Sequence, residues 1–113
     1  MTFFFLGSNG KLTRAIKSRS DIPYIFGDFK NKNFFDLKKA IDSTNFEFDQ
    51  IKNLFFYKSG RWDMETYNGL LIKLPKHKIK ESLELLVLFL NHNKNKKIKK
   101  LDLRQNNQII YNG

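Results

Sequence analysis

Polar and apolar residues alternate along residues 60–75, GRWDMETYNGLLIKLP, which predicts two antiparallel strands around Asn68-Gly69. A three-residue turn over 67–69 would pair Met64 with Ile72 and leave Asp63, Glu65, Leu71 and Lys73 on the opposite face. It would gather six core-compatible side chains on one face: Trp62, Met64, Thr66, Leu70, Ile72 and Leu74. We predict a type I turn with Gly69 in the left-handed conformation, followed by a bulge.

Two further segments have apolar residues at helical spacing. Phe34, Leu37 and Ile41 share one side of a helix predicted over 33–42, with Asn33 as its N-cap. A second helix is predicted over 79–91, after Pro75 ends the preceding strand. Its apolar stripe consists of Ile79, Leu83, Leu86, Val87 and Leu90, and it is widened by Leu85, Leu88 and Phe89.

The other apolar segments are short enough to be strands: Phe3–Leu6, Lys11–Ile16, Pro23–Phe26, Ile51–Tyr57 and Ile98–Arg104. The first two should pair antiparallel across a turn at 8–10, and 17–21 and 43–50 should be loops. A final strand, Gln108–Asn112, should return antiparallel after Asn106-Asn107. Because hairpins dominate and no βαβ crossover is indicated, we predict an α+β fold. It is one domain, 1–113, with a mostly antiparallel sheet packed by helices at about 33–42 and 79–91.

Composition narrows the classes of function. The chain has no cysteine, which excludes disulfides, cysteine-based zinc sites and thiol nucleophiles. Its formal net charge of +10 suits a nucleic-acid-binding protein. However, only four of the 21 basic residues are arginine, and Lys, Asn, Ile and Phe are all used heavily. This pattern resembles a general compositional bias, so the charge carries little weight.

Membrane and export signals are not indicated. The longest apolar run, Leu85–Leu90, is far shorter than the roughly 20 residues that a bilayer requires. The apolar start of the chain has no basic n-region and no cleavage site. The sequence alone predicts a soluble chain that stays where it is made.

Residues typical of an active site are scattered along the chain. His77 and His92 flank the second helix without further ligands at metal-binding spacing, so we expect solvated histidines and no metal. No phosphate-binding loop, nucleophile elbow or His-Glu-x-x-His motif occurs. Asp63 and Glu65 share a strand face, but their basic neighbours make them ordinary surface charges. We therefore predict no enzyme, no catalytic residue and no cofactor.

The densest charge cluster is Lys94–Lys100, KNKKIKK. Such a cluster can bind phosphates without sequence specificity, here through Lys96, Lys97, Lys99 and Lys100. Single-strand binders also expose aromatic rings beside their lysines, whereas the aromatics here lie in apolar runs. A solvated loop is the simpler interpretation, and a small nucleic-acid-binding domain is the alternative function.

The chain ends in a strand, and a terminal strand often lies at a sheet edge with unpaired backbone groups. Such an edge can accept a partner strand by β-augmentation. The pattern leaves a docking edge and a merely tolerated polar edge equally open. Proline at Ile110 is expected to impair docking by removing one backbone donor.

The order of motifs from residue 60 onward resembles the C-terminal β domain of the FtsQ/DivIB family. In that family a strand beginning Arg-Trp, an Asn-Gly-type turn and a Lys-Leu-Pro stretch precede a helix, before Asp-Leu-Arg and a final strand. The matching residues are Arg61, Trp62, Asn68, Gly69, Lys73, Leu74, Pro75, Asp102, Leu103 and Arg104. Pro23–Gly27 looks like the family's Leu-Pro-Leu-Val-x-Gly segment, so the resemblance extends over essentially the whole chain.

The resemblance implies a non-enzymatic module of the divisome, the assembly that forms the septum in cell division. The implied partners are FtsB and, through it, FtsL, with FtsB adding a strand to the final strand of the sheet. The implied partner-binding residues are Arg61, Arg104, Gln105, Asn107, Gln108, Ile109, Ile110, Tyr111 and Asn112. The implied location is the periplasmic face of the bacterial inner membrane at the division site.

Two departures from the family bear on this expectation. The family's cytoplasmic tail, transmembrane helix and POTRA domain have no counterpart within residues 1–113, and we expect no export signal in this stretch. Gln105 stands where the family commonly has an aromatic residue. An aromatic anchor would be expected to dominate a small interface.

Overall fold

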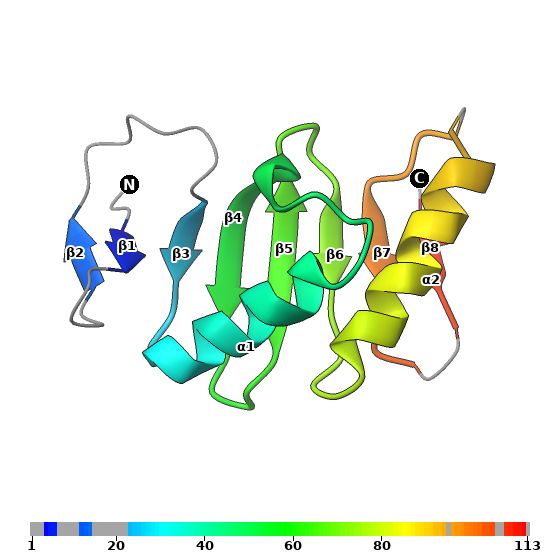
Figure 1. Ribbon diagram of the computed structural model, residues 1–113. Helices are drawn as coiled ribbons and strands as arrows, with labels where there is room; N and C mark the ends of the chain where they lie inside the picture. Colours follow the sequence, from blue (N-terminus) through cyan, green and yellow to red (C-terminus); the bar gives the residue numbers. More distant parts are fainter. Residues whose placement is uncertain (1–3, 7–11, 15–22, 95, 106–107, 113) are drawn as a thin grey trace.

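The computed structural model describes residues 4–6, 12–14, 23–94, 96–105 and 108–112, and within these the side chains of 23–111. Its centre is a six-stranded sheet in the order β3-β4-β5-β6-β7-β8. The strands are Tyr24–Phe26, Ile51–Phe56, Trp62–Thr66, Leu71–Lys73, Lys100–Asp102 and Ile110–Asn112. Helices α1 (Asn31–Asp42) and α2 (Ile79–His92) both cover the same face of the sheet (Figure 1). The fold class is α+β, as predicted.

Two neighbouring strand pairs are parallel, which the sequence did not indicate. Helix α1 connects β3 to the parallel β4, and α2 connects β6 to the parallel β7. The expectation that βαβ crossovers are absent is therefore wrong. Parallel strands usually appear in a sequence as continuous apolar runs, because helices cover both faces of a parallel sheet. Here both helices lie on one face (Figure 1), and burial alternates along β3, β6 and β7.

The hydrophobic core lies between the helices and the sheet. The helices contribute the buried residues Leu37, Ile41, Leu83 and Leu86, as their apolar stripes predicted. The strands contribute Ile25, Ile51, Leu54, Trp62, Met64, Ile72 and Leu101. The indole of Trp62 is only 2% exposed and lies 4.8 Å from the ring of Phe56 and 5.7 Å from that of Phe29. The helix face of the sheet is therefore covered from β3 to β7.

The β5–β6 hairpin has the predicted register. Met64 pairs with Ile72, and the Thr66 N–H donates to the Leu70 carbonyl at 2.9 Å. Gly69 has a φ of 88°, the left-handed conformation that the three-residue turn requires. One expectation is wrong: Asp63 is only 3% exposed and is not a surface charge. Its neighbours on the helix-free face cover it, as described below.

The remaining boundaries differ slightly from the predictions. Helix α1 begins at Asn31, and Asn33 is its third residue, whose Oδ1 accepts a hydrogen bond from the Lys30 N–H at 2.8 Å. The segment predicted as a loop contains a short 3₁₀ helix, η1 (Phe48–Gln50). Strands β1 (Phe4–Leu6) and β2 (Leu12–Arg14) pair antiparallel, as predicted. The predicted turn at 8–10 and loop at 17–21 lie outside the described residues.

Candidate functional site: the outer edge of β8

Strand β8 is the last strand of the sheet, and only β7 pairs with it among the described residues. Two bonds between β6 and β7 show which way the β7 backbone points. The Leu71 N–H donates to the Lys99 carbonyl at 3.0 Å, and the Leu103 N–H donates to the Lys73 carbonyl at 2.9 Å. Backbone groups alternate in direction along a strand. The intervening residues Lys100 and Asp102 therefore direct their N–H and C=O groups toward β8.

This alternation identifies the groups that β8 leaves open. Ile110 pairs with Asp102 and Asn112 pairs with Lys100, so both direct their backbone groups toward β7. Tyr111 lies between them, and its N–H and C=O point away from β7. The outer edge of β8 therefore offers one donor and one acceptor at Tyr111. The N–H of Ile110 faces β7, so proline at this position would remove a hydrogen bond within the sheet. That substitution therefore does not test the outward-facing groups of β8.

The side chains of β8 point to both faces of the sheet. Ile110 lies on the helix-free face and is 53% exposed. Tyr111 lies on the helix face, opposite Leu101 in β7, and its ring is 5.1 Å from that of Phe89 in α2. Lys96 Nζ donates a hydrogen bond to Tyr111 Oη at 3.3 Å. Large apolar surface therefore flanks the open backbone groups on each side.

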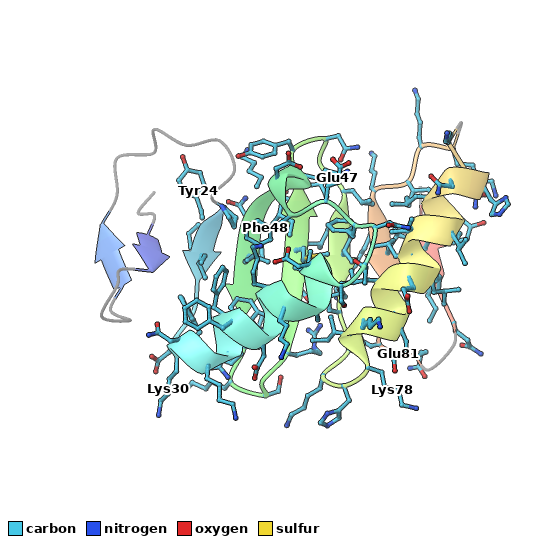
Figure 2. All side chains as sticks on the ribbon, in the orientation of Figure 1. Tyr24, Lys30, Glu47, Phe48, Lys78 and Glu81 are labelled. Carbon is cyan, nitrogen blue, oxygen red and sulfur yellow. The ribbon has the colours of Figure 1, made fainter. Side chains whose placement is uncertain are left out.

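A hollow of about 360 Å³ lies next to this edge, between α2 and the connection from β7 to β8. Gln105 and Gln108 line it together with Leu85 and Leu88 of α2. Leu88 is 58% exposed. Figure 2 marks Lys78 and Glu81, which also line the hollow, at the beginning of α2. The structure thus places Gln105 and Gln108 in the lining of the same hollow, ahead of β8.

Arg104 lies two residues after the end of β7 and is exposed. Its guanidinium donates two hydrogen bonds to the Asp102 carboxylate, at 2.9 and 2.6 Å. These bonds, and a third from the Arg104 backbone N–H at 3.0 Å, lower the pKa of Asp102 to about 2. Arg104 therefore stays near β7 and keeps nearly half of its side chain, 44%, in contact with solvent.

Arg61 lies away from this edge. It precedes β5, three strands from β8, which corresponds to about 14 Å at the usual strand spacing. Its guanidinium bonds to Asp63 at 2.6 Å and to the Leu74 carbonyl at 3.0 Å, and 19% of its side chain is exposed. The Tyr57 hydroxyl donates a further bond to Asp63 at 3.0 Å. These contacts explain the burial of Asp63. They also show that Arg61 has a structural role, because it neutralises Asp63 and bonds to the Leu74 carbonyl.

The lysine cluster 94–100 is divided between the two faces of the sheet. Lys96 contacts Tyr111 on the helix face, while Lys100 lies on the helix-free face with Lys73. The charge of Lys100 is the main cause of the lowered pKa of Lys73, with burial second. Lys96 and Lys100 of this cluster therefore lie on opposite faces of the sheet, which weakens the support for the nucleic-acid alternative.

The remaining candidates are isolated or undescribed. His77 and His92 are exposed at the two ends of α2. In the described part of the chain, no three His, Asp or Glu side chains gather as a metal site would require. None of the helices described is long and apolar enough to span a bilayer. Asn107 lies outside the described residues, as does the side chain of Asn112.

The chain was compared with known protein families and with curated proteins. A family model described as cell division protein FtsQ/DivIB, C-terminal, matches residues 2–104. No curated protein matches the chain. The family match includes the sheet from β3 to β7 and ends before β8 begins at Ile110. The chain therefore belongs to the family of FtsQ/DivIB C-terminal domains, and its role is in cell division.

Proposed function

We propose that this domain docks a divisome protein by accepting one of its strands at the outer edge of β8. The resemblance to the FtsQ/DivIB family supports FtsB as the partner in this proposal, and FtsB would bring FtsL with it. The observation that carries the proposal is the orientation of Tyr111, whose N–H and C=O point away from β7 at the end of the sheet. Main-chain hydrogen bonds to an added strand supply affinity without requiring a catalytic residue. In this proposal the domain is a non-enzymatic recruiter at the periplasmic face of the inner membrane.

Charge supports a different protein as the partner, in preference to a second copy of this chain. The chain carries a net charge of +10. Lys96, Lys100 and Arg104 all lie on or beside β7 and β8. Pairing two β8 edges would bring these cations toward their own copies, and like charges on neighbouring strands are destabilising. A strand with acidic or neutral side chains meets no such penalty.

Calorimetric titration with a peptide from the C-terminal segment of FtsB tests the proposal. Tyr111→Pro and Tyr111→Val both remove the ring, but only the proline removes the outward backbone donor. We expect the proline variant to bind about tenfold more weakly than the valine variant, because the lost hydrogen bond leaves a partner carbonyl unpaired. Deletion of residues 108–113 should abolish binding while the domain still folds. Equal affinities for the two Tyr111 variants, or binding that survives the deletion, would refute strand addition at this edge.

A further inference from the structure

Burial alone specifies the register of β8 weakly. Ile110 and Tyr111 point to opposite faces of the sheet, yet they remain 53% and 45% exposed. Both side chains are large and largely apolar, so a slip by one residue would exchange them with little change in buried surface. The slip would turn the N–H and C=O of Tyr111 toward β7 and those of Ile110 outward. Other contacts must therefore select the observed register.

Three contacts hold the Tyr111 ring on the helix face. The ring lies 5.1 Å from Phe89 at an interplanar angle of 56°. Lys96 Nζ donates to the hydroxyl at 3.3 Å and lies 5.4 Å from the ring centroid. An isoleucine moved to this position by a slip would lack the hydroxyl, the aromatic contact and the cation–π contact. These contacts therefore distinguish Tyr111 from Ile110, whereas burial does not.

We propose that Phe89 and Lys96 are positioning residues that set the register of β8 and so decide which backbone groups the domain displays. The strand has three residues and, among the residues that the structure describes, pairs with β7 alone, so a few contacts are enough to shift its population of registers. The effect of the β8 register on docking rests on the proposed function, because the displayed backbone groups are those that would bind the partner strand. The neighbouring Lys97 is also exposed but makes no such contact within the described part of the chain.

Amide hydrogen exchange of the full chain, followed by NMR without any partner, tests the register. The Ile110 and Asn112 amides face β7 and should be protected, whereas the Tyr111 amide should exchange rapidly. Lys96→Met should accelerate exchange at the two protected amides about two- to fivefold, the range for an exposed cation–π contact. Phe89→Leu should accelerate it about two- to tenfold, the range for an aromatic pair.

Matched variants separate positioning from general stabilisation. Lys96→Arg keeps a cation over the ring and should restore most of the protection. Lys97→Met removes an adjacent lysine and should change nothing. The amide of Met64, in the central strand β5, should keep its exchange rate in every variant. Unchanged exchange at Ile110 and Asn112 in both Lys96→Met and Phe89→Leu would overturn the proposal. A change shared by Met64, or produced equally by the Lys97 control, would do so too.

A second measurement links the register to docking. Lys96→Met should bind the FtsB peptide about two- to fivefold more weakly than the unchanged chain, in proportion to its loss of protection. Undiminished affinity in this variant would overturn the docking consequence. If neither the unchanged chain nor the Lys96→Met variant binds the peptide, while exchange at the Ile110 and Asn112 amides changes as expected, the proposed function fails and the register assignment is supported.

Discussion

Two Arg–Asp pairs in this domain have the same sequence spacing and the same bond length but different burial. Arg61 bonds to Asp63, and Arg104 bonds to Asp102, each at 2.6 Å. In the first pair the side chains are 19% and 5% exposed, and in the second 44% and 18%. We predict that Arg61→Met lowers the free energy of unfolding far more than Arg104→Met does, and that it leaves the intrinsic affinity of the folded domain for a partner unchanged.

The magnitudes follow from what each substitution leaves behind. Arg61→Met removes the cation that pairs with the buried Asp63 carboxylate and the donor that bonds to the Leu74 carbonyl. Breaking a buried ion pair in this way costs about 3–5 kcal/mol. Since 19% of the Arg61 side chain is exposed, water can replace part of the loss, so we expect about 3 kcal/mol. The pair of Arg104 should contribute less, about 1 kcal/mol, because solvent screens an arginine side chain that is 44% exposed. The melting temperature of the Arg61 variant should fall by roughly 10 °C.

Urea unfolding followed by the fluorescence of the buried Trp62, which is 2% exposed and the single tryptophan of the chain, measures both losses. Arg61→Lys is an informative third variant, because lysine keeps the charge but replaces the planar guanidinium, whose Nη1 bonds to both Asp63 and Leu74, with an ammonium of different geometry. It should lie between the other two. Equal losses for Arg61→Met and Arg104→Met, or a loss below about 1 kcal/mol for Arg61→Met, would refute the structural role assigned to Arg61.

Two further predictions concern backbone geometry and pH. Gly27→Ala should cost about 3 kcal/mol in urea unfolding, because its Cβ would lie 2.3 Å from the Phe56 carbonyl oxygen at a φ of 113°. Gly69→Ala has open space at a φ of 88° and should cost only about 1 kcal/mol, so equal losses would contradict the account. The carboxyl group of Asp102 should titrate at about 2 by NMR, and its midpoint should rise toward 3.8 in Arg104→Met. Because the pKa is lowered in the folded state, this pair stabilises the domain above pH 4. That contribution should disappear as the pH falls from about 4 to about 2, and an unchanged midpoint in the variant would contradict it.

The β5–β6 hairpin was predictable because its information is local. Alternation assigns Trp62 and Met64 to the core, and the left-handed turn position admits Gly69 at little cost. The burial of Asp63 was not predictable, because Tyr57 and Arg61 cover it only after β4 and β5 pair. Local alternation describes the face on which a side chain lies and leaves open how far its neighbours enclose it.

The edge itself was predicted, but the backbone groups that it displays were not. A terminal strand with a preceding turn signal indicated the antiparallel pairing of β8 with β7. The orientation of Tyr111 depends on the phase of the hydrogen bonds between β6 and β7, which are parallel and joined by a crossover that the sequence did not indicate. The contact between Lys96 and Tyr111 likewise joins residues 15 positions apart, and no local pattern indicates it.

The Tyr111 amide gives the most direct test of docking at the outer edge of β8. Its hydrogen exchange should be fast in the free domain and at least about tenfold slower when the FtsB peptide is present at saturation, because the added strand accepts its hydrogen bond. The Met64 amide, deep in the sheet, serves as the internal reference. A Tyr111 amide that exchanges equally fast in the saturated complex would contradict strand addition at β8.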